Sequence, residues 1–144
     1  MTSLRKRQSG FTIVELLIVI IIIGILATLV IVQFTNQQKK ARDTQRKTDI
    51  GAVETHLEAY YASNGVYPSY TDLNTPAWRT ANLKGLKTDA LVGPKAGTLQ
   101  SSVATGDNYG YVATPDGCTT ACENYSLTTL LEDGGTVYEK KSEN

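Results

Sequence analysis

The sequence has few of the residues on which catalytic and metal sites depend. Its 144 residues include one histidine, His56, and two cysteines, Cys118 and Cys122. This set does not supply a histidine-based catalytic triad or a four-ligand zinc site. Because the chain carries 14 basic and 14 acidic residues, it also lacks the cationic excess of a general nucleic-acid binder. The sequence therefore predicts a protein that is not an enzyme, with no cofactor, no metal and no specific nucleic-acid site.

Charged residues are almost absent from one long segment near the N-terminus. No Lys, Arg or His lies between residues 8 and 38, and the apolar run covers residues 11–32. A helix of that length is roughly 33 Å long, close to the ~30 Å thickness of the hydrocarbon layer of a membrane. The β-branched residues 18–23 would suit a buried strand in water, but a lone strand in lipid leaves its backbone groups unpaired. The run therefore predicts a transmembrane helix.

The ten residues before this run form a short basic leader. Residues 1–10 contain Arg5, Lys6 and Arg7 and no acid, which is typical of a targeting segment rather than of a folded element. An ordinary secretory signal is excluded, because the apolar run is too long and no small-residue cleavage pattern follows it. The small residue, Gly10, precedes the run instead.

Glu15 is the one acidic residue inside the apolar run. An unpaired carboxylate there costs on the order of 2 to 4 kcal/mol, and no cation lies nearby in the sequence. Cleavage before Phe11 would create an amino group that could meet Glu15 of a neighbouring subunit. At ~4 Å and an effective dielectric near 20, that pair contributes about 4 kcal/mol. The alternative is that Glu15 lies close enough to the interface to reach water.

Residues 10–20, Gly-Phe-Thr-Ile-Val-Glu-Leu-Leu-Ile-Val-Ile, resemble the leader junction of type IV pilins and pseudopilins. The resemblance implies that a membrane peptidase cuts after Gly10 and methylates the new amine of Phe11, and that Phe11 and Glu15 direct assembly. It also implies a helical homopolymer, an inner-membrane assembly platform and membrane lipid as partners. Similar proteins usually carry a proline at the position of Val32. Since this chain does not, Gly24 is the expected weak point of the helix.

The helix is expected to continue beyond the membrane as an amphipathic stalk, residues 33–65. The apolar residues Ile50, Val53, Leu57 and Tyr60 follow helical spacing and would cover a sheet. Ser63, Asn64 and Gly65 indicate the end of the helix. The stalk also carries a basic cluster: Lys39, Lys40, Arg42, Arg46 and Lys47. It could bind nucleic acid or anionic lipid, but Asp43 and Asp49 interrupt it. It is therefore interpreted either as a solvated helix face or as a contact with acidic neighbouring subunits.

The remaining chain is expected to form a connection and then a small sheet. Residues 66–107 are rich in Gly and Pro and predict a long loop, with short helical turns at residues 71–73 and 83–91. Residues 108–144 show three segments of alternating pattern, which predict three antiparallel strands. The predicted fold is therefore α+β: one long N-terminal helix, half transmembrane and half amphipathic, packed on a three-stranded antiparallel sheet.

Two small features of the last third leave alternatives open. Cys118 and Cys122 favour a disulfide in a compartment outside the cytoplasm, with free thiols as the alternative. Asp107, Asp116, Glu132 and Asp133 suggest calcium ligands, but their spacing matches no calcium loop and no metal site is predicted.

Taken together, the sequence predicts a pilin, and the resemblance implies its roles. After removal of residues 1–10 it would build a type IV pilus, a surface filament used for adhesion, twitching motility or DNA uptake. The second interpretation is a major-type pseudopilin of a type II secretion system, and a third is an uncleaved membrane-anchored domain. Counting cations on both sides of the span favours the opposite orientation, but the leader places the C-terminal domain outside the cytoplasmic membrane.

Overall fold

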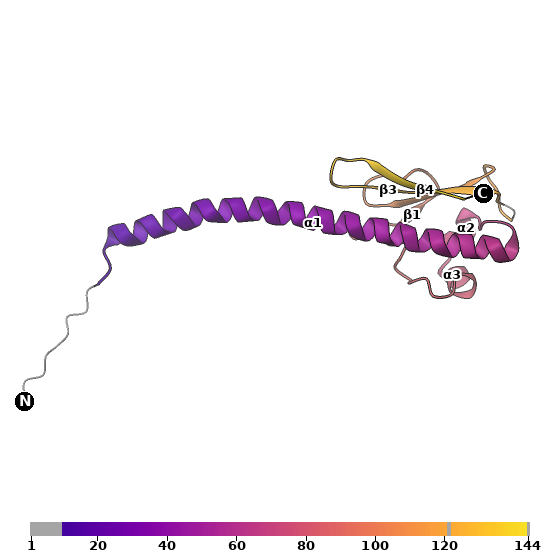
Figure 1. Cartoon of the computed structure of the whole chain (residues 1–144), viewed down its shortest axis with the longest axis horizontal. Coiled ribbons are helices and arrows are strands. Elements are labelled where there is room, and N and C mark those ends of the chain that lie inside the picture. The colour runs from indigo at the N-terminus through magenta and orange to yellow at the C-terminus, as the bar shows by residue number, and fades with distance from the viewer. Residues whose placement is uncertain (1–9, 121, 144) are drawn as a thin grey trace, which may run out of the picture. The chain divides into compact units, whose positions relative to one another are not determined.

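The computed structural model describes residues 10–120 and 122–143 and has the α+β class that the sequence predicts. Its helices are α1 (Ile13–Asn64), α2 (Tyr70–Asn74) and α3 (Pro76–Asn82). Its strands are β1 (Leu99–Gln100), β2 (Tyr109–Thr114), β3 (Asn124–Leu130) and β4 (Val137–Lys141). Figure 1 shows the strands lying alongside the C-terminal part of α1, with α2 and α3 in the connection between helix and sheet.

Helix α1 ends close to its predicted boundary. Gly65 has a φ of 71°, and its N–H donates to the carbonyl of Tyr61 at 2.7 Å. Only glycine adopts this left-handed conformation without strain, so Gly65 stops the helix and satisfies one of its last carbonyls. The chain divides into two compact units between Gln38 and Lys39, and α1 contributes to both.

The second unit, which we call the outer domain (residues 39–143), has its own apolar core. Ile50, Val53 and Leu57 of α1 are 2%, 0% and 0% exposed and pack against the sheet. The other large members of the core come from every part of the outer domain: Tyr67, Leu73, Leu83, Leu91, Leu99, Tyr109, Tyr111, Tyr125 and Leu127. Burial of the three α1 side chains contributes roughly 1.5 to 3 kcal/mol each.

The sheet has four strands in mixed orientation, so the prediction of a three-stranded antiparallel sheet was partly wrong. The strand order is β1-β2-β3-β4, and β1 runs parallel to β2 through two residue pairs. The other pairs are antiparallel, as predicted. A strand of two residues is too short to show an alternating pattern, so β1 could not be predicted within the expected loop.

Two of the glycines allow the connection to pack closely on the sheet and on itself. A side chain at Gly110 in β2 would collide with the carbonyl of Ser102, and one at Gly97 would collide with the carbonyl of Asp107. Residues 101–108 therefore lie directly against β2. There the N–H of Ala104 donates to the hydroxyl of Thr128 in β3 at 2.8 Å.

The expected loop of residues 66–107 also contains two short helices. α2 matches the turn predicted at residues 71–73 and begins with a capping box between Ser69 and Asp72. In the region predicted to turn at residues 83–91, the structure has hydrogen-bonded turns but no helix, since the N–H of Leu86 donates to the carbonyl of Leu83 and that of Ala90 to the carbonyl of Lys87. The helix of this region lies earlier, at α3. Pro76 occupies the first turn of α3, where its fixed φ suits a helix start.

Candidate assembly site

The carboxylate of Glu15 lies at the first turn of α1 and caps it together with Thr12. The backbone N–H and the hydroxyl of Thr12 donate to Oε2 of Glu15 at 2.8 and 2.9 Å. In return the N–H of Glu15 donates to the hydroxyl of Thr12 at 3.2 Å. This is a capping box, in which two backbone donors at the helix start are satisfied reciprocally. The carboxylate is thereby held in place before any second subunit is present.

Thr12 is a partner of Glu15 that the sequence interpretation missed. No cation lies near Glu15 in the sequence, but the spacing Thr-x-x-Glu at a helix start is itself the signal of a capping box. Thr12 hydrogen-bonds to one carboxylate oxygen only. Within the part of the chain that the structure describes, Oε1 of Glu15 has no hydrogen-bond partner.

The predicted processing position lies outside the helix. Gly10, Phe11 and Thr12 precede α1 and belong to no helix or strand. Phe11 is 88% exposed. Such a backbone is open to a peptidase, because cleavage requires an extended segment rather than a hydrogen-bonded helix.

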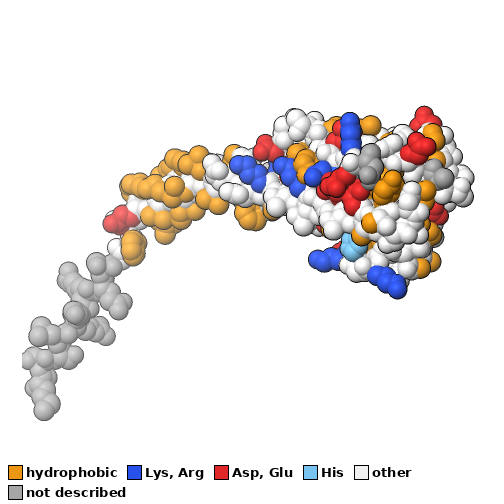
Figure 2. Space-filling model, turned by 45° about the vertical axis from the view of Figure 1, so that its right-hand side comes forward, with side chains coloured by type: hydrophobic (Ala, Val, Ile, Leu, Met, Phe, Trp, Pro, Cys, Tyr) orange, Lys and Arg blue, Asp and Glu red, His pale blue; other side chains and the backbone are white. Residues whose placement is uncertain are grey.

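The apolar segment that follows Glu15 has no internal packing partner. Every large apolar side chain of residues 13–34 is at least half exposed in the chain alone. Figure 2 shows these side chains covering the N-terminal part of α1. The helix is long and apolar enough to cross a membrane. A helix that is apolar on all sides requires lipid or other protein around it.

Gly24 lies in this segment, and the structure places it in the continuous helix α1. A side chain there would meet no neighbour within 4 Å. Its role as a weak point of an assembled helix stays a prediction.

The residues expected to hold the stalk to the sheet lie in the outer-domain core. Ile50, Val53 and Leu57 are buried in it, and Tyr60 packs at its edge with its ring centroid 5.2 Å from that of Trp78. Three tyrosine hydroxyls add polar contacts that the spacing did not indicate. Tyr109 donates to Asp49 at 2.8 Å, while Tyr67 and Tyr125 donate to Glu58 at 2.8 and 2.9 Å.

An ion network, which we call the Arg46 cluster, joins α1 to two distant loops. The Arg46 side chain is fully buried and contacts Asp43, Asp107 and Glu132 at 2.8 to 2.9 Å. Arg42 makes a bidentate pair with Glu132, with both distances 2.7 Å. Lys95 approaches Glu132 at 3.1 Å, so three cations face three carboxylates.

The environment of this network lowers the pKa of two of its acids, Glu132 and Asp43. Hydrogen bonds from Arg42, then from Lys95 and Arg46, hold the pKa of Glu132 well below its usual value despite partial burial. For Asp43, burial acts to raise the pKa, but the N–H groups of Glu132 and Asp133 and the Arg46 guanidinium together lower it. Both groups are therefore ionised at neutral pH and stabilise the fold there.

The structure corrects the interpretation of the basic cluster on the stalk as one surface. Arg42 and Arg46 are turned into the Arg46 cluster, whereas Lys40 and Lys47 are exposed. The spacing Asp43-x-x-Arg46 could have revealed the inward pair, because residues three apart share a helix face. Two of the acids considered as calcium ligands, Asp107 and Glu132, instead pair with Arg46. Among the described residues no group of three His, Cys, Asp or Glu side chains could hold a metal ion.

Cys118 and Cys122 form a disulfide, with their Cα atoms 5.5 Å apart. Cys122 is fully buried, and its carbonyl accepts the N–H of Tyr67 at 2.8 Å. The bridge therefore ties the loop between β2 and β3 to the chain that leaves the end of α1.

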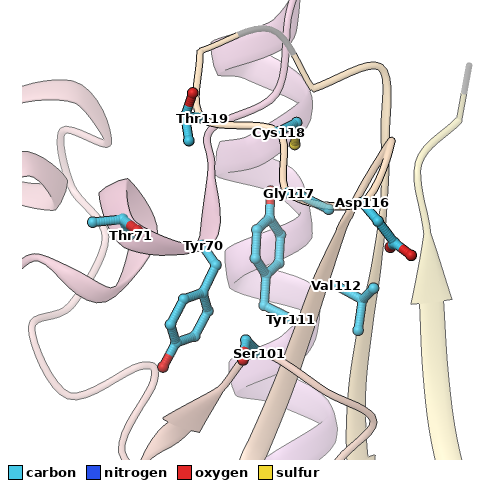
Figure 3. A pocket seen from close by; sticks show the side chains of 10 residues that line it. Tyr70, Thr71, Ser101, Tyr111, Val112, Asp116, Gly117, Cys118 and Thr119 are labelled. Atoms are coloured by element: carbon cyan, nitrogen blue, oxygen red, sulfur yellow. The ribbon is translucent and has the colours of Figure 1, made fainter.

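A pocket of about 370 Å³ lies between α2, β2 and this disulfide loop. Figure 3 shows Tyr70 and Tyr111 on its walls, with Gly117 and Cys118 on the loop beside them. Both hydroxyls are already engaged, since Tyr70 donates to the carbonyl of Leu99 and Tyr111 to that of Pro68. Asp116 is the one charged residue in the lining. The pocket offers no nucleophile paired with a base, as a catalytic site would require.

Comparison with known proteins gives matches to part of the chain. The family model of the prokaryotic N-terminal methylation motif matches residues 5–31. Type II secretion system core protein G of Pseudomonas aeruginosa is 43% identical over 65 residues, 45% of this chain and 46% of that protein. The same-named proteins of Aeromonas hydrophila and Vibrio cholerae are 42% and 41% identical, over 45% and 44% of this chain and 46% and 44% of their own length.

The match thus spans less than half the length of these relatives. No solved structure matches the chain. The three relatives are named as core proteins of a secretion system. The methylation motif thus covers the leader junction, and about 45% of the chain is similar to type II secretion system core protein G.

Proposed function

We propose that the chain is a pseudopilin, the structural subunit of a filament in a type II secretion system. The observation that carries this proposal is the identity of 41% to 43% with three secretion-system core proteins. It favours the second interpretation of the sequence over the first, a type IV pilus for adhesion, twitching motility or DNA uptake. A secretion filament works inside the cell envelope, so the proposed location is the periplasm rather than the cell surface.

The first step is processing at the membrane. Residues 11–32 anchor the chain, and a prepilin peptidase cuts between Gly10 and Phe11 and methylates the new amine. The non-helical backbone of residues 10–12 supports this step, because α1 begins only at Ile13. Cleavage removes three cations and leaves 11 basic and 14 acidic residues in the mature chain.

The second step is polymerisation driven by burial of the apolar helix. Once extracted from lipid, the exposed apolar side chains of residues 13–34 must be covered by other copies. A head-to-tail contact that does not close gives an open helical filament. Thr12 holds Oε2 of Glu15, and Oε1 is left to accept the Phe11 amine of a neighbouring copy.

Two measurements test the proposal. Mass spectrometry of the chain from its native cells should show loss of residues 1–10 and one methyl group on Phe11, and a Gly10→Val variant should stay uncut. Deletion of the gene should abolish secretion of envelope-exported enzymes while leaving sheared surface filaments unchanged. Loss of surface filaments with normal secretion would instead identify a type IV pilus subunit. Retention of the leader in the native chain would contradict both.

A further inference from the structure

We propose that Lys39 and Lys40 bind the phosphate headgroups of anionic phospholipids before assembly, at the outer face of the membrane that holds α1. The inference rests on the proposed membrane stage of the chain, but not on the kind of filament that it later builds. It starts from the basic cluster of the stalk, which the structure separates into internal and external charges.

The first step concerns which cations are available. Arg42 and Arg46 are neutralised within the fold by Asp43, Asp107 and Glu132. Lys39 and Lys40 make no ion pair with any acid in residues 10–120 or 122–143, and Lys40 is exposed. Their charges are therefore free to interact with an anion outside the chain.

The second step concerns position along the chain. Phe34 is the last large exposed apolar residue of the N-terminal run. Lys39 and Lys40 follow it by five and six residues, about 8 and 9 Å along a helix. The headgroup layer is roughly 5 to 8 Å thick on each side of the hydrocarbon. Lysine stems reach back toward this layer while the ammonium stays in polar surroundings.

The third step concerns the absence of competing acids. No Asp or Glu occurs between Glu15 and Asp43, and the carboxylate of Asp43 is occupied by Arg46 and by two backbone N–H groups. The residues that separate Phe34 from Lys39 are uncharged: Thr35, Asn36, Gln37 and Gln38. Asp133 lines a hollow of about 280 Å³ with Lys40 and Lys47, but it makes no ion pair with either lysine among the described residues. Residues 16–42 therefore carry cations and no acid.

A cationic segment next to the membrane is attracted to a surface of anionic lipid headgroups. Each lysine near that surface contributes a factor of about five to binding at moderate salt.

The test uses the uncut full-length chain in nanodiscs of phosphatidylcholine that contain spin-labelled phosphatidylglycerol or spin-labelled phosphatidylcholine. The fraction of motionally restricted label gives the preference for the anionic lipid. We expect a several-fold preference in the wild type. It should fall by up to about five-fold for each of Lys39→Gln and Lys40→Gln, and it should weaken as salt screens the charges.

A matched control removes the same charge elsewhere. Lys47 follows Phe34 by thirteen residues, about 20 Å along a helix, and Lys84 is exposed in the connection after α3. The double variant Lys47→Gln/Lys84→Gln should keep the preference. Equal losses in this control would show an effect of net charge alone and would overturn the proposal.

Two further outcomes would also overturn it. A preference that is as large in Lys39→Gln/Lys40→Gln as in the wild type would show that these lysines do not bind headgroups, since the leader cations Arg5, Lys6 and Arg7 are the same in both proteins. The same double variant can also be expressed in cells and its filament yield measured. An unchanged lipid preference in nanodiscs together with a reduced filament yield in cells would assign the lysines to an acidic surface of a second copy. Because the measurement precedes cleavage and assembly, its result is independent of whether the filament serves secretion.

Discussion

The two compact units of this chain differ in whether their side chains find contacts within the chain. In residues 13–34 the large apolar side chains are exposed, and the single carboxylate, Glu15, has only Thr12 as a partner among the described residues. In the outer domain even the guanidinium of Arg46 is fully buried and meets three acids. The first unit therefore takes its stability from what surrounds it, and the second takes it from its own contacts.

This difference predicts where the effect of a substitution will be measured. A change in the first unit should alter insertion or assembly and leave the unfolding of the outer domain unchanged. A change in the outer domain should alter unfolding first. Trp78 is the one tryptophan of the chain and packs beside Tyr60, so its fluorescence reports unfolding of the outer domain alone.

The largest effect is expected from Glu15→Val. This variant should insert and be cut normally, but polymer should be nearly absent, because each contact loses an ion pair of about 4 kcal/mol, roughly a thousand-fold. The measurement is the amount of sedimentable filament, compared with Ile22→Val as a control in the same apolar segment. Wild-type amounts of polymer from Glu15→Val would contradict the role assigned to the carboxylate.

In the outer domain the largest effect is expected from Arg46→Met. Removing a buried cation leaves Asp43, Asp107 and Glu132 without their shared partner, which costs about 3 to 5 kcal/mol of unfolding free energy. Urea unfolding of the chain in detergent, followed by Trp78 fluorescence, measures the loss. Lys40→Met, on the same helix but exposed, should change stability by less than about 0.5 kcal/mol.

The pH dependence sharpens this comparison. In the wild type the pKa values of Glu132 and Asp43 are lowered, so their contribution is fully present above the ordinary carboxyl pKa and is lost as the pH falls through the folded values. In Arg46→Met, Glu132 and Asp43 lose one cationic partner, so their pKa values should rise relative to the wild type, and protonation should relieve the repulsion between them. The stability difference between the two proteins should therefore shrink from pH 7 toward pH 4. A constant difference would show that Arg46 acts through packing rather than charge.

A pair of identical substitutions compares the two units directly. Leu57→Ala removes a fully buried side chain and should destabilise the outer domain by about 2 to 5 kcal/mol. Leu26→Ala makes the same change in the apolar segment, where the side chain is 56% exposed, and should leave Trp78-monitored unfolding unchanged. Equal losses would mean that the two units unfold together and that their independence is wrong.

Local signals in the sequence were sufficient to predict much of this architecture. The apolar run gave the long helix, and the spacing of Ile50, Val53 and Leu57 gave the buried face of its C-terminal part. The alternating segments gave β2, β3 and β4, because each is long enough to show a period of two. Residues 10–20 indicated the resemblance to pilins and pseudopilins, and the methylation-motif model matches the same segment.

The features that the sequence did not reveal depend on contacts between distant residues. Arg46 pairs with Asp107 and Glu132 across 61 and 86 positions, and no local pattern links an arginine to acids so far away. The strand β1 has two residues and is defined as a strand only by its pairing with β2. The contact between Thr12 and Glu15, by contrast, could have been predicted from their spacing of three residues at the start of a helix.

The smallest of these effects is expected from removing the disulfide with Cys118→Ala/Cys122→Ala. The bridge closes a loop of only five residues, so the loop-entropy estimate is about 2 kcal/mol, near or below the cost of Leu57→Ala. The N–H of Tyr67 should also exchange faster with solvent, because its acceptor is the carbonyl of Cys122. Thr119→Ala, an exposed change in the same loop, should affect neither measurement.

Since the bridge lies wholly in the outer domain, filament yield should be unchanged at temperatures where that domain stays folded. A loss of filament from a stably folded double variant would therefore place this loop at a contact between copies, and would show that assembly depends on more than the apolar unit.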